Sequence, residues 1–249
     1  MKYFFERIVK PFIIESHYYN ILEIGAEYGY NTDKLISNAS TNLTIIDPCI
    51  AFDLEAKYKG KTQIKVLKGL SLNFLPKISG PFDSILIDGD HNWYTVFNEL
   101  KIIAERNLIK EGGAIFFHDV SWPYARRDMY YSPESIPKEF RHPYAKQGME
   151  KGKSELLPSG GLNPDLYNAL YEGGQRNGVR TAIDDFLAQF GKDYFFFDMK
   201  TEFGLGVLIR KKNLKTFFTA LRWFLILKCY ELRTHAGILI KHKILHLQE

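Results

Sequence analysis

The chain has 249 residues, of which 45% are hydrophobic, 15% aromatic and 25% charged. This composition excludes a collagen-like, low-complexity or disordered chain, because enough apolar side chains are present to form a core. The 33 Lys and Arg residues exceed the 29 Asp and Glu residues by four, and so small an excess does not point to a nucleic-acid partner.

The two cysteines, Cys49 and Cys229, lie far apart and belong to no CxxC motif. Their spacing argues against a disulfide framework or a zinc-cysteine site, and it fits a reducing compartment. The N-terminus lacks the apolar run of a secretory signal. The most apolar stretch, 217–230, contains Arg222 and is shorter than the roughly 20 apolar residues that span a bilayer. We expect a soluble, cytoplasmic protein, with the inner membrane surface as the alternative location.

Short apolar runs alternate with helical patterns in the first half of the chain. Strands are expected at 20–24, 43–47, 64–67, 82–88 and 112–119, the last after a Gly-Gly turn. Helices are expected to begin near Asn31, to lie around 51–58 and to cover 93–107, where apolar residues recur at helical spacing. Short apolar strands separated by helices predict a parallel α/β sheet with right-handed crossovers.

The second half of the chain has a different character. Residues 121–178 hold six of the ten prolines and many tyrosines, which predicts a long irregular insertion that serves as a lid or a substrate-binding loop. A helix at 179–190 and an antiparallel edge hairpin, with strands at 194–198 and 206–210, are expected to follow. We therefore assign 1–213 to one domain and 214–249 to a separate helical segment.

The C-terminal segment 214–249 is amphipathic and basic. Its six Lys and Arg residues and two Glu residues give it a net charge of +4. A helix of this kind lies on an anionic membrane surface, or it packs against its own domain or a second copy. The aromatic residues Phe217, Phe218, Trp223 and Phe224 favour packing or oligomerisation.

The first motif that carries chemistry follows the first expected strand. It consists of Glu23, Gly25, Ala26, Glu27 and Gly29. Glycines there let the backbone approach a ligand, and the next helix offers free N–H groups at its start. The GxxxG spacing is not the GxGxxG of dinucleotide-binding folds, which disfavours an NAD-dependent dehydrogenase. Asp47 ends the next strand, where an acid can bind both ribose hydroxyls. The glycine motif together with Asp47 therefore favours nucleoside binding over an ordinary turn.

Two more motifs end the later strands, Ile-Asp-Gly-Asp-His at 87–91 and Phe-His-Asp at 117–119. Because α/β sheets bind ligands at the carboxyl edge, Asp88, His118 and Asp119 are expected to converge there. This set of oxygens with one imidazole suits Mg²⁺ or Mn²⁺. His91 could take a proton from a substrate hydroxyl, and the alternative for each residue is a helix cap or a solvated loop position.

Taken together, these motifs resemble the class I S-adenosylmethionine-dependent methyltransferases. More narrowly they resemble the methyltransferase 24 family, which is related to the macrolide-sugar and catechol-type O-methyltransferases. The resemblance covers about residues 18–212. It implies a Rossmann-like fold with a seven-stranded, mostly parallel sheet and an antiparallel edge hairpin. It also implies methyl transfer to a hydroxyl of a sugar, a glycoconjugate or a small natural product.

The resemblance assigns roles to the motifs. The residues from Glu23 to Gly29 would surround the methionine part of the cofactor, and Asp47 would bind its ribose. Gly69, Leu70 and Ser71 would border the adenine. Asp88 would serve the cofactor site and catalysis and, with His118 and Asp119, would bind a metal ion. Catechol-type enzymes have Asp-Asn where this chain has His118-Asp119, a departure that bears on metal use. The histidine of the 87–91 motif, His91, would be the general base.

The insertion supplies the acceptor candidates, which are Trp122, Tyr124, Arg126, Arg127 and Tyr130. Aromatic faces suit a sugar or phenol, and arginines can hold a phosphate or carboxylate. The alternative is a loop that packs over the sheet. Two other functions stay open: a metal-dependent relative of the cephalosporin hydroxylase type that transfers no methyl group, and a cofactor-binding scaffold for the basic helix.

Overall fold

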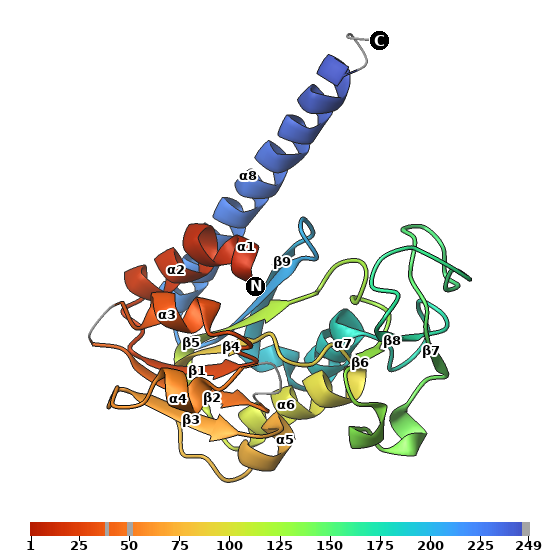
Figure 1. Cartoon of the computed structure of the whole chain (residues 1–249). Coiled ribbons are helices and arrows are strands. Elements are labelled where there is room, and N and C mark those ends of the chain that lie inside the picture. The colour runs from red at the N-terminus through yellow and green to blue at the C-terminus, as the bar shows by residue number, and fades with distance from the viewer. Residues whose placement is uncertain (38–39, 49–51, 246–249) are drawn as a thin grey trace.

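The computed structural model describes residues 1–37, 40–48 and 52–245 (Figure 1). Cys49 and the first residue of the helix expected at 51–58 lie outside these ranges. Within them, a central sheet is covered by helices on both faces, and a long helix leaves the domain at the C-terminal end.

The central sheet has seven strands in the order β3-β2-β1-β4-β5-β10-β9. Strands β1 to β5 are mutually parallel, whereas β10 runs antiparallel to both β5 and β9 and so forms the predicted edge hairpin. The bounds are β1 Asn20–Ile24, β2 Asn42–Asp47, β3 Ile64–Lys68, β4 Phe82–Ile87, β5 Ile109–His118, β9 Tyr194–Met199 and β10 Leu205–Arg210. The predicted α/β Rossmann-like sheet is confirmed.

Helices cover the two faces of the sheet. On one face lie α1 (Lys2–Phe4), its helical continuation Phe5–Val9, α2 (Lys10–Glu15), α3 (Tyr30–Leu35), α4 (Leu54–Lys57) and α8 (Leu214–Leu245). On the other face lie α5 (Ser71–Phe74), α6 (Trp93–Glu105) and α7 (Val179–Phe190), the last followed by a short turn, Gly191–Asp193. Side chains alternate between the two cores along each strand, as Phe116 and Phe117 of β5 show.

The fifth strand differs from the prediction. It begins at Ile109, before the two glycines, and continues through them. A Cβ at Gly113 would lie only 2.7 Å from the carbonyl oxygen of Asp83 on β4. The glycine pair therefore permits close contact between strands rather than forming a turn.

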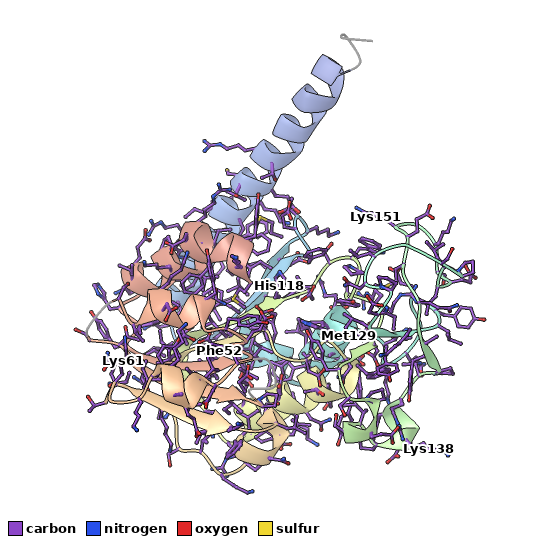
Figure 2. All side chains as sticks on the ribbon, in the orientation of Figure 1. Phe52, Lys61, His118, Met129, Lys138 and Lys151 are labelled. Carbon is purple, nitrogen blue, oxygen red and sulfur yellow. The ribbon has the colours of Figure 1, made fainter. Side chains whose placement is uncertain are left out.

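The insertion at 121–178 was predicted to be irregular, and this was wrong in one respect. It contains a three-stranded antiparallel sheet in the order β6-β8-β7. Its elements are β6 Met129–Tyr130, β7 Tyr144–Lys146, β8 Tyr167–Ala169 and two helical turns, Pro133–Ser135 and Lys138–Phe140. The strands have only two or three residues, too few to give an alternating pattern. In Figure 2, Lys138 and Lys151 mark the outer end of this insertion.

The N-terminal helical segment was not predicted, yet it forms much of one core. Its fully buried residues are Phe4, Phe5, Ile8, Val9 and Phe12. Phe12 stacks on Trp223 of α8 at 4.7 Å between ring centroids, so the two ends of the chain pack together. In the described part of the chain, no helix is long and apolar enough to cross a membrane.

Candidate active site

The loop after β1 lies close to the loop after β4. Gly25 has φ +82°, and a Cβ there would lie 2.3 Å from the Cα of Gly89. Gly29, at the start of α3, has φ +77°, and a Cβ would lie 2.1 Å from the Tyr58 hydroxyl. Only glycine fits either position, because the backbone is left-handed and the space is filled. The two glycines thus set the path of the loop at the carboxyl edge.

Asp47 holds this loop in place. Its Oδ2 accepts hydrogen bonds from the backbone N–H of Ala26 at 2.7 Å and of Glu27 at 3.0 Å. Its own carbonyl accepts from the N–H of Gly69 at 2.9 Å, which ties the loop after β3 to the same point. Three predicted cofactor segments therefore meet at the end of β2.

Glu23 lies at the end of β1 and is 1% exposed. Its Oε2 accepts a hydrogen bond from the Thr32 hydroxyl, while its Oε1 has no hydrogen-bond partner among the described residues. Burial raises the pKa of Glu23 to about 8, and the charges of Asp88 and Asp47 add to the shift. A buried carboxyl oxygen without a partner, beside the glycine loop, fits a ligand that carries a positive group.

The segment 69–71 forms the far side of the same edge. Leu70 is 44% exposed, whereas Ser71 is 8% exposed at the start of α5. Glu99 of α6 lies beside Ser71, is fully buried, and has no hydrogen-bond partner for either carboxyl oxygen among the described residues. Burial raises the pKa of Glu99 to about 8. No sequence pattern distinguishes Glu99, because it lies within an amphipathic helix like its neighbours.

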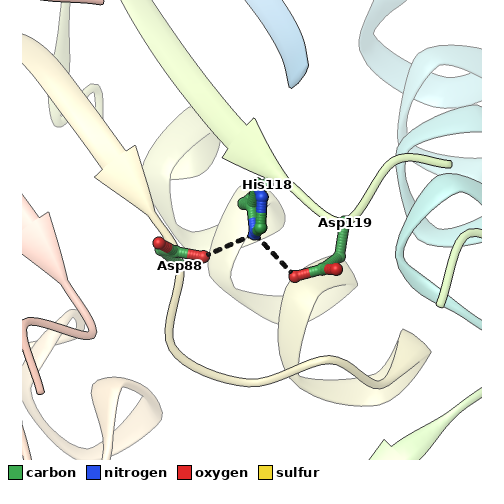
Figure 3. A group of neighbouring side chains, drawn as sticks. All are labelled: Asp88, His118 and Asp119. Carbon is green, nitrogen blue, oxygen red and sulfur yellow. Dashed lines mark ion pairs between the residues drawn. The ribbon is translucent and has the colours of Figure 1, made fainter. Parts of the chain in front are cut away.

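Asp88, His118 and Asp119 converge at the ends of β4 and β5, as predicted (Figure 3). His118 Nδ1 lies 3.1 Å from Asp88 Oδ1 and 2.8 Å from Asp119 Oδ2. Asp119 has φ +58°, an uncommon backbone conformation for a residue with a Cβ. That conformation directs the chain after β5 away from the sheet while its carboxylate stays beside the imidazole.

The three groups shift one another's protonation. Burial alone would lower the pKa of His118, but the carboxylates of Asp88 and Asp119 outweigh it and raise that pKa to about 9. Burial alone would raise the pKa of Asp88, yet the amino group of Met1 and His118 together hold it well below its usual range. The pKa of Asp119 is also lowered, because His91 and His118 outweigh its burial.

The cluster fits a divalent ion by its donor chemistry. One ligand atom from each of the three residues lies within 4.8 Å of the others, and two carboxylates with one imidazole suit Mg²⁺ or Mn²⁺. A proton on His118 would compete with such an ion, because the same nitrogen faces both carboxylates.

His91 joins this cluster through Asp119. Its Nδ1 lies 3.1 Å from Asp119 Oδ2, the same oxygen that contacts His118. The ring is stacked on Tyr124 at 5.6 Å and faces Tyr131 at 5.8 Å, both from the insertion. A carboxylate on one ring nitrogen orients the imidazole and leaves the other nitrogen for chemistry. The pairing of His91 with Asp119 was not predicted from the sequence.

The predicted acceptor residues have different positions. Trp122 is partly exposed, and Tyr124 is 4% exposed with its hydroxyl accepting from Asn163 Nδ2 at 2.7 Å. Arg126 pairs with Asp184 of α7 at 2.6 Å and keeps 43% of its side chain exposed. Trp122 and Arg126 leave surface that a ligand can contact, whereas Tyr124 is buried.

Two further predicted acceptor residues, besides Tyr124, are buried within the insertion. Arg127 is fully buried and donates to the carbonyl oxygens of Ala169 and Ser154. Tyr130 is 1% exposed and donates to Asp128 at 2.9 Å. Both side chains take part in the packing of the insertion itself, whereas the neighbouring Tyr131 is 55% exposed.

The N-terminal segment covers the cluster. The amino group of Met1 lies 2.5 Å from Asp88 Oδ2, and the ring of Phe4 lies 6.1 Å from that of His118. A cavity of about 910 Å³ lies elsewhere, along α6 and α7, and is lined by none of the predicted cofactor residues. Met1 thus occupies Oδ2 of Asp88, while Oδ1 faces His118.

Comparison with known protein families finds a match in the first half of the chain. The methyltransferase 24 family model, described as a methyltransferase domain, matches residues 22–120, the span from β1 to the end of the β5 motif. No curated protein sequence matches the chain.

Solved structures are similar to the chain at low sequence identity, and one of them reaches the TM-score of a shared fold. A methyltransferase from Podospora anserina with bound S-adenosylhomocysteine is 16% identical, with a TM-score of 0.50 over 80% of this chain and 75% of that chain. A Staphylococcus aureus protein described as a caffeoyl-CoA O-methyltransferase is 18% identical, with a TM-score of 0.49 over 81% of this chain and 80% of that chain. An O-methyltransferase from Bacillus cereus with bound S-adenosylhomocysteine is 15% identical, with a TM-score of 0.47 over 82% and 79%.

Proposed function

We propose that this protein is an enzyme that methylates a hydroxyl group of a small molecule, because a methyltransferase-domain family model matches residues 22–120 and the sheet has a Rossmann-like strand order. The acceptor class is a sugar, a glycoconjugate or another small natural product, and the methyl donor is S-adenosylmethionine. The observation that carries the proposal is the position of His91, which pairs with Asp119 and stacks on Tyr124 at the carboxyl edge of the sheet.

The cofactor end of the proposal rests on the glycine loop. The loop from Gly25 to Gly29, held by Asp47, would bind the methionine part of the cofactor, and Glu23 would face its ammonium group. Asp47 would also bind the ribose, and Gly69 to Ser71 would border the adenine. Bound S-adenosylmethionine supplies an activated methyl group on a sulfonium, so the protein's task is alignment and deprotonation.

His91 would act as the general base. Asp119 accepts the Nδ1–H of His91, which leaves Nε2 to take the proton of the acceptor hydroxyl. The oxygen then bonds to the methyl carbon as the carbon–sulfur bond breaks, and S-adenosylhomocysteine leaves. Asp119 would stabilise the imidazolium that forms, since its lowered pKa keeps the carboxylate ionised.

The acceptor would lie against the aromatic rings of the insertion. Tyr124 and Tyr131 flank His91, and Trp122 and Arg126 offer an aromatic face and a cation nearby in sequence. Aromatic faces pack against the apolar side of a sugar or phenol ring, and an arginine can hold an acidic substituent.

A divalent ion held by Asp88, His118 and Asp119 would supply positive charge that lowers the pKa of the acceptor hydroxyl. Removal of metal with EDTA, followed by readdition of Mg²⁺, measures that contribution. Activity that EDTA leaves unchanged would remove the ion from the proposal and leave proton removal to His91.

The test of the function is release of S-adenosylhomocysteine with a panel of sugars, glycosides and phenols as acceptors. We expect turnover with at least one class, and a loss of about 100-fold or more in His91→Asn. His17→Asn, at a histidine on an exposed turn, is the matched control and should retain full activity. Methyl transfer by His91→Asn at the wild-type rate would exclude the assigned base.

A further inference from the structure

Helix α8 has two apolar faces, of which the domain covers one. Its buried row consists of Thr216, Ala220, Trp223 and Leu227, which pack against the sheet and the N-terminal helices. This spacing of three and four residues is the ordinary pattern of a helix that closes a core. The domain therefore covers only one side of the helix.

The opposite side of α8 is apolar and exposed. Leu214, Phe218, Leu221, Leu225 and Leu232 are 69%, 57%, 41%, 53% and 71% exposed, and they follow a spacing of three, four or seven residues. Phe217 and Phe224 widen this stripe along one edge and are 42% and 37% exposed. Large apolar side chains gathered on one face mark a contact surface rather than ordinary scatter. Beyond the packed turns, α8 continues away from the domain (Figure 1).

Basic side chains flank the exposed stripe. Lys215, Arg222 and Arg233 are seven and eleven residues apart, which places all three on the same side of the stripe at about 100° per residue. All three are exposed, and among the described residues only Arg222 of the three forms an ion pair, with Glu15 at 2.9 Å. The whole helix carries six basic residues and one acid, Glu231, which pairs with Lys228.

We propose that this face of α8 binds the surface of an anionic lipid bilayer. The apolar stripe would enter the boundary between headgroups and acyl chains, and the basic row would contact the lipid phosphates. The exposed stripe runs along α8 from Leu214 to Leu232, which is 19 residues, so the contact would be about 28 Å long. The helix would lie along the surface, because it is not apolar enough to cross it.

Charge favours a lipid surface over a second copy of the chain. Two α8 helices that packed antiparallel through their exposed stripes would bring their two basic rows together. Each helix has six basic residues and a single acid, so little negative charge would offset the repulsion. Like charges along a helix interface oppose pairing, whereas an anionic surface neutralises them.

The test is co-sedimentation of the full-length protein with vesicles of phosphatidylcholine alone or mixed with phosphatidylglycerol. We expect binding to the mixed vesicles, weakening as salt is added, and little binding to neutral vesicles. The double substitution Leu221→Glu and Leu225→Glu should abolish it. Lys215→Gln with Arg233→Gln should weaken it about 25-fold, since each basic residue near an anionic surface contributes roughly a factor of five.

Tyr171→Glu is the matched control, because it puts the same charge on a residue of the insertion that is 60% exposed. It should bind vesicles as the wild type does, and circular dichroism should show all variants folded. Equal binding to both vesicle types, no binding, or binding that the α8 substitutions leave unchanged would overturn the proposal. A dimer in light scattering that Leu221→Glu and Leu225→Glu dissolves, without vesicle binding, would assign the face to a second copy instead.

Discussion

Asp128 is a buried carboxylate whose removal should lower the stability of several elements at once. Its Oδ1 accepts from the backbone N–H of Trp93 at 2.7 Å and of Gly178 at 2.6 Å, and its Oδ2 accepts from the Tyr130 hydroxyl. One carboxylate thus joins the start of α6, the start of α7 and the insertion. Asp128→Ala would leave three buried donors without an acceptor. At about 1–3 kcal/mol for each, the expected loss is roughly 3–9 kcal/mol of the free energy of unfolding.

Asp128→Asn is the informative control, because its amide oxygen can still accept from both backbone N–H groups. The Tyr130 hydroxyl can turn to accept from the amide nitrogen, so we expect a cost of no more than about 1.5 kcal/mol. Urea unfolding followed by tryptophan fluorescence gives both free energies. An Asp128→Ala variant within about 1 kcal/mol of wild type, or equal losses in the two variants, would refute the reasoning.

Three further predictions concern the cofactor edge. Gly25→Val should abolish cofactor binding and lower the free energy of unfolding by at least about 2 kcal/mol. The control is Gly152→Ala, which is also at positive φ but has open space around it. It should cost only about 1 kcal/mol in thermal unfolding. Asp47→Ala should weaken S-adenosylmethionine binding at least tenfold in calorimetry, because two loop N–H groups lose their acceptor; unchanged affinity would contradict its role. Glu99→Gln tests the burial of an acid whose pKa is raised from 4.5 to about 8. Because the folded state keeps the proton to higher pH than the unfolded state, the free energy of unfolding of the wild type, relative to the variant, should fall by on the order of 3–5 kcal/mol as the pH rises between those two values. A difference in unfolding free energy that does not change with pH would contradict this prediction.

The sheet could be predicted because its strands are short apolar runs between clear helical patterns. Strand 20–24 and helix 179–190 lie where the periodicity placed them. The N-terminal helix was not predicted, although Phe4, Ile8 and Phe12 recur at helical spacing. The strands of the insertion are set by buried groups such as Asp128 rather than by local pattern, and no sequence window contains that information.

The site was predictable as far as strand ends define it. Asp88, His118 and Asp119 come together because β4 and β5 are parallel neighbours, which the alternation of elements implied. The contact of His91 with Asp119 depends on the positive φ of Asp119 and on the course of the loop after β4. Neither feature can be predicted from the spacing of residues in the sequence. Likewise, nothing in the sequence distinguishes the buried Tyr130 from the exposed Tyr131.

The central claim is that the carboxyl edge of this sheet binds S-adenosylmethionine. Its most direct test is calorimetric titration of the purified protein with S-adenosylmethionine in a buffer that contains magnesium. We expect saturable binding to one site in the micromolar range, on the order of −8 kcal/mol at 1 μM, and its loss in Glu23→Gln. No detectable binding to well-folded protein would leave the fold intact and contradict the proposed activity.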